Sequence, residues 1–212
     1  MKIAIVKRRG EIGKLQTVIE LLPAEVWKGR ILDVGCRGGK LGKLLLNSLF
    51  YCGVDLFPPA TVIANVERGL PFKSCSFDCV VALDVLEHTD DIYRAFEELV
   101  RVSRKFIVIT LPNCYEFRLR WRFLIGRRLS GKYGLPPDRP LDRHRWLISL
   151  KDAYDFVHFQ ANKLGLDILQ EFYLLGHRRY LCKMLANLVP SLLVGWYLVL
   201  FQRSKTEEKA GM

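Results

Sequence analysis

The sequence lacks several features that would assign it to a familiar class of protein. It has no internal repeat and no low-complexity tract, so a repeat array is excluded. The apolar run within residues 1–9 is too short for a secretory signal. Among its six cysteines, Cys75 and Cys79 lack the close pairing and the histidines of a zinc site. We therefore predict no metal site, and reduced, buried thiols in a cytoplasmic protein are the simplest account.

What is present suits a single folded domain. The chain has 212 residues, and half of them are apolar, which is enough for a full core. We expect this domain to occupy residues 1–203 and the polar tail 204–212 to be loose. The oligomeric state is not predicted.

A strand, a glycine-rich turn and a helix follow one another near the start of the domain. The strand contains Asp33 and leads into Gly35-Cys-Arg-Gly-Gly39, after which a helix is expected at 40–49. A second strand, at 51–55, ends in Asp55. Glycine lets backbone approach a ligand, and a carboxylate can accept hydrogen bonds from two ribose hydroxyls. This unit predicts a nucleoside-containing cofactor, the structural alternative being a plain turn with Asp55 as a helix N-cap.

The spacing of the glycines distinguishes between cofactors. A dinucleotide fingerprint reads G-x-G-x-x-G, which these residues do not match. The run Asp33-Val-Gly-Cys-Arg-Gly-Gly39 resembles instead the D-x-G-x-G-x-G loop of class I S-adenosylmethionine-dependent methyltransferases. Arg37 stands where that pattern has its middle glycine. It could meet the carboxylate of the cofactor, or it could crowd the site and weaken binding.

The resemblance continues over about residues 28–112. Asn65 stands where the family usually has an aspartate near the adenine amino group, and residues 76–88 look like the fourth strand and its tip. The resemblance is to the type 11 branch, and it implies S-adenosylmethionine as the cofactor. The residues implied to bind it are Asp33, Gly35, Cys36, Arg37, Gly39, Asp55, Leu56, Asn65, Val66 and Asp84.

Helices and strands alternate along the chain. This pattern predicts an α/β fold, a Rossmann-like doubly wound sheet of seven strands, mostly parallel with the last strand antiparallel. Strands are predicted at 31–34, 51–55, 61–64, 79–83, 106–111, 167–174 and 196–201, and helices at 14–22, 40–49, 92–102, 151–164 and 178–194. Asp33, Asp55, Asn65 and Asp84 then all lie at carboxyl ends of strands, where ligands bind in such sheets.

The positive charge is concentrated in one segment. Residues 101–151 contain thirteen lysines and arginines against three acids, which accounts for most of the net charge of +11. We predict that 113–150 is a basic, substrate-facing insertion between the cofactor half and the C-terminal part, 151–203. Such a patch attracts a small anionic acceptor, an acidic lipid surface or nucleic acid. A solvated, solubilising face is the alternative.

The start of this insertion admits two interpretations. Phe117, Leu119, Trp121 and Phe123 alternate with arginines, as in a strand. Phe117, Trp121 and Leu124 also share one side of a helix, and the preceding Pro-Asn pair favours a helix start. The insertion is loosely similar to MetW-type methionine-biosynthesis proteins. Many methyltransferases of the general branch have a histidine that faces the substrate ahead of the following helix, and His144 fits that place.

Residues 184–201 form an uncharged run at the lower length limit for crossing a bilayer. Asn187, Pro190 and Gly195 interrupt this run, and its last part is needed as a strand. We therefore favour a soluble domain. Contact with an anionic membrane surface, with Trp121 or Trp196 at the interface, is the alternative.

The implied chemistry indicates which residues could catalyse it. The methyl carbon of S-adenosylmethionine is already electrophilic, but a hydroxyl acceptor must lose a proton. The candidates for the catalytic group are His144, which we prefer, His88 and Asp84, although His88 alone could be a structural histidine.

Three functions compete on the sequence. The first is O-methylation of a small molecule, glycan or lipid-linked acceptor. The second is a non-catalytic, MetW-like accessory role with a biosynthetic partner. RNA methylation is disfavoured because Asp84-Val-Leu-Glu87 replaces the Asn/Asp-Pro-Pro-aromatic motif of enzymes that modify base nitrogens.

Overall fold

A computed structural model describes residues 1–45, 50–129, 132–135, 137–138, 140, 142–176 and 183–204. The strands are β1 (Lys2–Ile5), β2 (Arg30–Val34), β3 (Phe50–Asp55), β4 (Val62–Ile63), β5 (Phe77–Leu83), β6 (Ser103–Pro112), β7 (Leu166–Leu175) and β8 (Trp196–Arg203). The α-helices are α1 (Glu11–Leu21), α2 (Lys40–Leu44), α3 (Ile92–Val102), α4 (Phe117–Leu124), α5 (Leu150–Lys163), α6 (Lys183–Leu188) and α7 (Pro190–Leu193). Short 3-10 helices are η1 (Ala24–Trp27), η2 (Val66–Arg68) and η3 (Leu86–His88).

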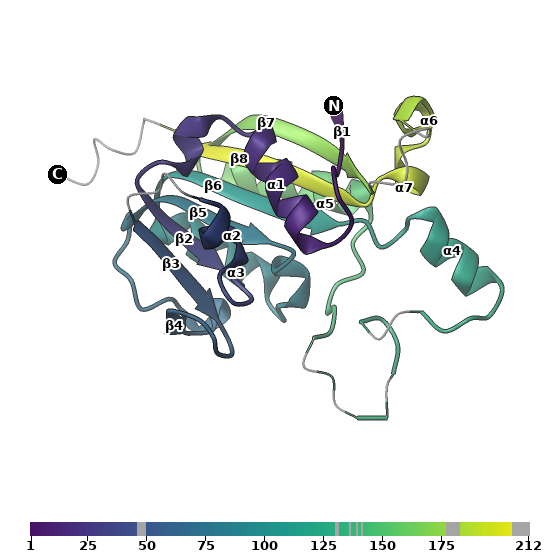
Figure 1. The fold of residues 1–212 in the computed structure, drawn as a ribbon, viewed down its shortest axis with the longest axis horizontal. Coiled ribbons are helices and arrows are strands. Elements are labelled where there is room, and N and C mark those ends of the chain that lie inside the picture. The colour runs from purple at the N-terminus through teal and green to yellow at the C-terminus, as the bar shows by residue number, and fades with distance from the viewer. Residues whose placement is uncertain are drawn as a thin grey trace.

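The described strands form one sheet in the order β1-β7-β8-β6-β5-β2-β3-β4, with helices on both of its faces (Figure 1). Neighbouring strands from β6 to β4 pair in parallel, whereas β8 is antiparallel to both β6 and β7. The predicted α/β class, the mostly parallel sheet and its antiparallel last strand are confirmed.

The predicted number of strands was wrong by one. Within the described residues the sheet has eight strands, because β1 pairs in parallel with β7 from Lys2 opposite Phe172 to Ile5 opposite Leu175. Four residues carry too little periodicity to predict a strand, and the partner that holds β1 lies far along the chain. β1 is therefore a strand because it pairs with β7, and its own sequence does not predict it.

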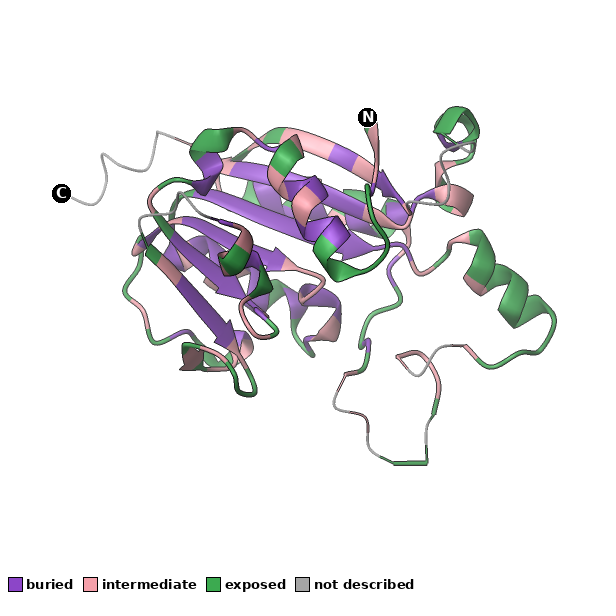
Figure 2. Ribbon diagram, in the orientation of Figure 1, coloured by how far each residue is buried: buried purple, intermediate pink, exposed green. Residues whose placement is uncertain are grey.

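Alternation along the central strands divides the core between the two faces of the sheet. In β2, Ile31 packs on the face that carries α1 and α2, and Leu32 packs on the face that carries α3 and α5. In β5, Val80 and Val81 alternate in the same way. Both sides of the central strands are therefore buried, as the mostly purple strands of Figure 2 show.

The flanking helices start where the sequence offers a cap. The side chain of Asp91 accepts a hydrogen bond from the Arg94 amide at the start of α3, which coincides with the predicted 92–102 helix. A capping box between Ser149 and Asp152 starts α5. Gly165, with φ +62°, follows the end of α5.

The helices near the ends of the chain differ from their predicted bounds. The first one, α1, begins at Glu11 rather than at residue 14, and α2 ends at Leu44. The rest of the predicted 40–49 helix lies mainly in residues 46–49, outside the described part, as do residues 177–182 and the tail from 205.

A single 178–194 helix is not what the described residues show. From residue 183 onward there are two short helices, α6 and α7. Val189 separates them, and Pro190 is the first residue of α7. The uncharged run 184–201 is thus divided between α6, α7 and β8. No helix among the described residues is long and apolar enough to span a membrane.

The cysteine prediction was partly wrong. The five described cysteines are free thiols, and Cys36, Cys52 and Cys79 are buried as expected. Cys75, however, is exposed, and Cys114 is half-buried. Cys75 lies in the turn before β5, where its side chain is exposed.

We predict that a ring buried between α3 and the sheet contributes more to the free energy of unfolding than a ring exposed on a helix surface. Phe96 is fully buried, with ring centroids 5.6 Å from Phe156 and 5.5 Å from Phe201. Phe96→Ala should lower the free energy of unfolding by about 3–5 kcal/mol in urea titrations, because it leaves a cavity. Phe159→Ala is the matched control, since Phe159 on α5 is 68% exposed and its loss should change stability little. Equal effects of the two variants would contradict the packing described here.

Candidate functional site

Two adjoining cavities lie at the carboxyl ends of the central strands. The larger one has a volume of about 570 Å³, within the range of sites for small molecules. The smaller one, of about 50 Å³, shares Gly35, Arg37 and Asp84 with it. Of the predicted cofactor residues, the larger cavity is lined by Gly35, Arg37, Asp55, Leu56, Asn65, Val66 and Asp84, and the smaller one by Asp33, Gly35, Cys36, Arg37 and Asp84.

The glycine-rich turn between β2 and α2 explains this convergence. Gly35 has φ +73°, and a Cβ placed on it would lie 2.4 Å from Cγ2 of Val85. Only glycine fits at that position. The predicted Gly39 lines neither cavity; with φ +70° it is the N-cap residue of α2. Its role in the described structure is to turn the chain into the helix.

Arg37 also adopts the left-handed backbone region, with φ +41°. This explains why a glycine is usual at its place in the family pattern, because side chains are strained in that region. The Arg37 amide donates to Oδ2 of Asp55 at 3.0 Å, which ties the turn to the end of β3. Its guanidinium pairs with Oδ2 of Asp142 at 2.9 Å and is directed to the insertion.

Asp142 connects the insertion to both halves of the site. Its Oδ2 also lies 3.1 Å from the ammonium of Lys132, and its Oδ1 lies 3.0 Å from Nδ1 of His88. Burial raises the pKa of Asp142, but Lys132, His88 and Arg37 outweigh that effect and hold it below its ordinary value. A single ionised carboxylate therefore joins the glycine-rich turn to the tip of β5.

Asp33 is buried beneath the turn and accepts a 2.5 Å hydrogen bond from the hydroxyl of Tyr51. Burial is the main reason that the pKa of Asp33 rises to about 7, although the Tyr51 hydrogen bond acts in the opposite direction. The Asp33 carboxyl is thus close to half-protonated at neutral pH in the folded chain.

Asp84 lies at the carboxyl end of β5 with φ +56°. Its Oδ1 accepts from the buried ammonium of Lys14 at 2.5 Å and from the hydroxyl of Thr110 at 2.8 Å. Burial raises the pKa of Asp84, but Lys14 and these hydrogen bonds lower it below its ordinary value. Asp84 is therefore a fixed negative charge where the two cavities meet.

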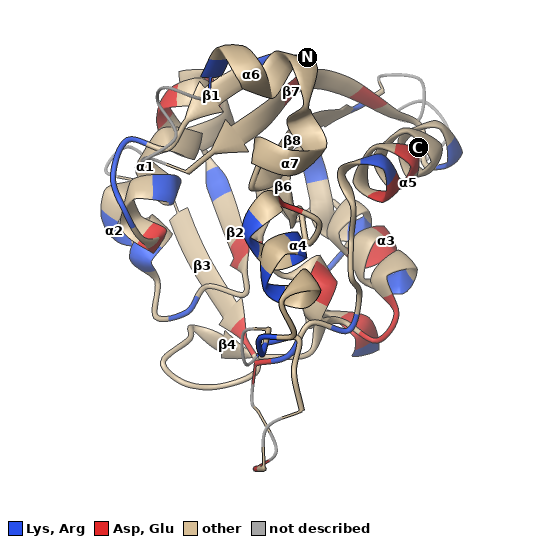
Figure 3. Cartoon of the chain, turned by 90° about the vertical axis from the view of Figure 1, so that its right-hand side faces the viewer, with Lys and Arg blue, Asp and Glu red and all other residues tan. Residues whose placement is uncertain are grey.

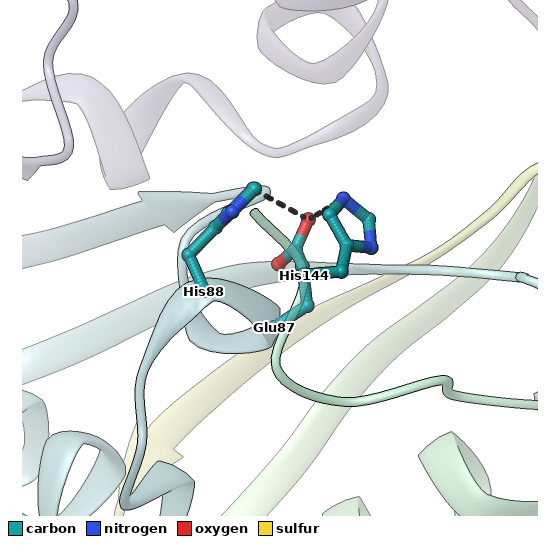
Figure 4. Close-up of side chains that lie close together, drawn as sticks. All are labelled: Glu87, His88 and His144. Atoms are coloured by element: carbon teal, nitrogen blue, oxygen red, sulfur yellow. Dashed lines mark ion pairs between the residues drawn. The ribbon is translucent and has the colours of Figure 1, made fainter. Parts of the chain in front are cut away.

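The three side chains Glu87, His88 and His144 converge beside the larger cavity (Figure 4). Oε1 of Glu87 lies 3.7 Å from Nε2 of His88 and 4.0 Å from Nε2 of His144. Burial, followed by the charge of Asp84, raises the pKa of Glu87 to about 8. Burial, followed by His88, lowers the pKa of His144 to about 4, and burial also lowers that of His88. His88 lines the larger cavity, whereas His144, 8% exposed, lines neither cavity and lies behind it.

Asn65 lies at the far end of the larger cavity. Its Oδ1 accepts a hydrogen bond from the amide of Glu67 at 2.9 Å and starts η2. Val66, which is buried, and Leu56, which is 52% exposed, line the same cavity. Together these residues combine a polar edge with apolar walls, as expected for the pocket of a heterocycle.

The basic segment surrounds the entrance to this region. Figure 3 shows basic residues, in blue, along α4 at the surface. The insertion returns from α4 toward β4 and α3. Pro140, Asp142, Arg143 and Arg145 from the insertion line the larger cavity. These contacts bring the end of the insertion to the larger cavity, and its role in facing a substrate stays a prediction.

The sequence did not identify Lys14, Thr110, Glu87 or Asp142 as site residues. Lys14 and Thr110 carry no motif, and they meet Asp84 only through the fold. Glu87 adjoins His88, so it could have been considered as part of the same cluster. Asp142 stands out only as one of the few acids in the basic segment.

We predict that Asp33 makes stability depend on pH. Because its pKa is raised from 3.8 to about 7 on folding, the folded chain holds a proton that the unfolded chain releases. The stabilisation is fully present below about pH 4 and is lost as the pH rises to 7, by up to about 1.4 kcal/mol per pH unit. In urea titrations between pH 4 and 7, Asp33→Asn should lose this contribution and show a shallower slope, the remainder coming from other buried acids such as Glu87, whereas the exposed Asp167→Asn should keep the wild-type slope. Parallel curves for Asp33→Asn and the wild type would contradict the burial argument.

Comparison with known proteins identifies the fold of the chain and a domain family that matches part of it. The methyltransferase domain family Methyltransf_11 matches residues 32–106. A possible histamine N-methyltransferase from Thermotoga maritima superposes with a TM-score of 0.57 at 18% identity, covering 90% of this chain and 88% of that one. Magnesium protoporphyrin IX methyltransferase from Synechocystis PCC 6803, with bound S-adenosylhomocysteine, gives 0.57 at 17% identity over 91% and 83%.

The cyclase SpnF also superposes, with a TM-score of 0.59 at 14% identity over 91% of this chain and 80% of that one. The reactions named for these structures differ, so the fold does not identify the acceptor. The family match begins in β2 and ends in β6, the part of the chain that supplies most of the residues lining the two cavities. The chain therefore has the fold of the class I S-adenosylmethionine-dependent methyltransferases, and residues 32–106 match the methyltransferase domain family.

Proposed function

We propose that this protein binds S-adenosylmethionine in the two adjoining cavities and transfers its methyl group to a hydroxyl of a small or lipid-linked acceptor. The observation that carries the proposal is the convergence of Asp55, Asn65 and Asp84 on one cavity of about 570 Å³ at the switch point of the sheet. The family match covers the same strands. The cavity thus combines suitable size, position and hydrogen-bonding groups.

The residues present fit this cofactor. The Asp55 carboxylate accepts from the backbone amides of Leu56 and Arg37 at 2.7 and 3.0 Å, so its orientation is fixed before a ligand arrives. Its remaining lone pairs can accept hydrogen bonds from ribose hydroxyls. Asn65 can meet the adenine amino group, and the missing Cβ of Gly35 leaves room for close backbone approach.

Charge complements the other end of the cofactor. The amino acid part of S-adenosylmethionine carries an ammonium and a carboxylate, and its sulfonium is positive. Asp84 and Asp33 supply acceptors around the smaller cavity, where Lys14 can balance a carboxylate. Arg37 need not block the site, because its guanidinium is engaged by Asp142.

The protein has to align the acceptor and accept its proton. S-adenosylmethionine supplies a methyl group on positively charged sulfur, and holding an acceptor in line with it can lower the barrier by about 7–11 kcal/mol. His88 lines the larger cavity, as does Asp84, and the His144 ring lies 4.6 Å from the His88 ring, so these three remain our candidates on the acceptor side. The fixed charge of Asp84 supports an electrostatic role more than proton transfer.

We predict that Asp55 decides cofactor affinity. Asp55→Ala should weaken the binding of S-adenosylmethionine and S-adenosylhomocysteine by about 10- to 100-fold in calorimetric titrations, because it removes charge-assisted hydrogen bonds. Asp167→Ala is the control, since Asp167 is exposed on β7, remote from the cavities. Saturable binding that survives Asp55→Ala would place the ligand elsewhere. No binding by the wild type would favour the accessory, non-catalytic function.

We also propose that the insertion contacts an anionic membrane surface, where it would meet a lipid-linked acceptor. None of the residues of α4 is buried. Trp121, Phe123 and Leu124 are 52%, 73% and 76% exposed and lie between arginines. Aromatic and aliphatic side chains beside arginines suit the boundary between acyl chains and anionic headgroups.

The neighbouring helices extend this apolar surface. Asn113 donates to the carbonyls of Ser191 and Val194, which fixes the start of the insertion against α7. On α6, Met184 and Leu188 are 84% and 78% exposed. The α4, α6 and α7 helices lie at the same end of the sheet in Figure 1. The same insertion supplies Asp142 and His144 to the site, so contact with lipid would lie close to the cavity.

Vesicle binding tests this contact. The protein should sediment with vesicles that contain phosphatidylglycerol and much less with pure phosphatidylcholine, and added salt should weaken the binding. Phe123→Ala should reduce binding several-fold, whereas Phe159→Ala, which removes a similarly exposed ring from α5, should not. Equal binding to both kinds of vesicle, or equal loss in both variants, would contradict the proposal. Binding to RNA but not to anionic vesicles would assign the basic surface to nucleic acid.

A further inference from the structure

The cluster of Glu87, His88 and His144 has the composition of a metal site. One ligand atom from each residue lies within 4.8 Å of the other two. Figure 4 shows a Glu87 oxygen between the two imidazole rings, which face it from η3 and from the insertion. Two imidazoles and one carboxylate are a common ligand set for divalent transition metals.

The hydrogen bonds of His88 determine which of its nitrogens is free. Nδ1 lies 3.0 Å from the carbonyl oxygen of Arg143 and 3.0 Å from Oδ1 of Asp142. Both partners are acceptors, so Nδ1 carries the proton and donates. Nε2 then presents a lone pair toward Glu87. A histidine oriented by a carboxylate and a carbonyl through its other nitrogen is the usual arrangement around bound metal ions.

Polar atoms in this cluster lack partners within the protein. Among the described residues, Oε2 of Glu87 and Nε2 of His88 are buried and have no hydrogen-bond partner. Glu87 is 1% exposed and His144 8% exposed. Burial of an unpartnered acceptor is unfavourable, and more so for a charged group. A cation held by the Glu87 carboxylate and by Nε2 of His88 would give both of these buried groups a partner.

We propose that Glu87, His88 and His144 bind one divalent transition-metal ion beside the larger cavity. Bonds of about 2.0–2.2 Å place neighbouring ligand atoms roughly 3 Å apart. The present separations of 3.7 and 4.0 Å from Glu87 Oε1, and of at most 4.8 Å within the whole cluster, require the side chains to close by about one to two ångströms. Imidazole favours zinc, iron(II), cobalt(II) or manganese(II) over magnesium and calcium, whose ligands are mainly oxygen.

Three protein ligands leave coordination positions open. His88 lines the larger cavity, so an open position can be reached by an acceptor from that side. This role rests on the proposed methyl transfer. An acceptor hydroxyl bound to the metal would release its proton to water more readily. Its oxygen would then form a bond to the methyl carbon, while the carbon–sulfur bond breaks and its electron pair returns to sulfur. Metal binding itself does not depend on this step.

Cobalt(II) provides a direct test with tag-free protein that has been treated with chelator. Titration should give visible d–d absorption bands that saturate at one equivalent, and zinc should displace them. Glu87→Gln and His144→Ala should each abolish the saturable bands. Glu87→Gln is nearly isosteric, so its far-UV circular dichroism and thermal unfolding should remain close to the wild type and exclude misfolding as the cause.

His158 provides the matched control. Its Nε2 lies 3.0 Å from Oε1 of Glu171 on the other side of α5, so it is a second histidine–glutamate pair outside the cluster. His158→Ala should leave cobalt binding unchanged. Asp142→Asn should weaken it by about 10- to 100-fold while preserving the stoichiometry, because Asp142 positions His88 and is not itself a ligand.

Each outcome distinguishes the metal site from the methyltransferase proposal. Absence of saturable cobalt bands at millimolar metal, or equal bands in Glu87→Gln and the wild type, would overturn the metal site. Calorimetry with S-adenosylmethionine on the same preparation reports separately on the cofactor site. Metal binding without cofactor binding would support the metal site and contradict the proposed methyl transfer. Cofactor binding without metal binding would contradict the metal site and leave the methyl transfer proposal standing.

Discussion

The arrangement of the site depends on one buried ion pair. The Lys14 ammonium lies within 2.5 Å of Asp84 and 3.0 Å of Thr110, beneath α1 and between the ends of β5 and β6. An unpaired ammonium or carboxylate at that depth would be strongly unfavourable, so α1 and the two strand ends are held together. Asp84 in turn keeps its charge beside both cavities. A helix outside the family match thus fixes the central acid of the site.

The two sides of the site arise from different parts of the sequence. The cofactor side comes from consecutive β–α units, so its positions follow from parallel pairing. The acceptor side comes from η3 at the tip of β5 and from the insertion, which returns to the sheet at α5. His88 and His144 meet there with ring centroids 4.6 Å apart, although they are far apart in the chain. The cofactor side is therefore built locally, and the acceptor side by long-range contacts.

This difference explains how much the sequence could predict. Asp55 ends one predicted strand and Asn65 follows another, so their place at the sheet edge could be predicted directly, and the bounds of α3 were predicted to the residue. β1 and Lys14 could not be found in this way, because their partners β7 and Asp84 lie far along the chain. His144 was expected to face the acceptor, whereas burial behind Glu87 is a property of packing that no local pattern encodes.

Asp142 accepts from Arg37 of the glycine-rich turn and from His88 of the tip of β5 through different oxygens of one carboxylate. A ligand that drew the Arg37 guanidinium toward itself would change the hydrogen bonding of Asp142, and with it the orientation of His88. Thermodynamic linkage makes such an effect reciprocal, so occupancy on either side must alter affinity on the other by the same factor. The total binding free energy of two ligands would then not depend on the order in which they bind, while the affinity measured for each would depend on whether the other is bound.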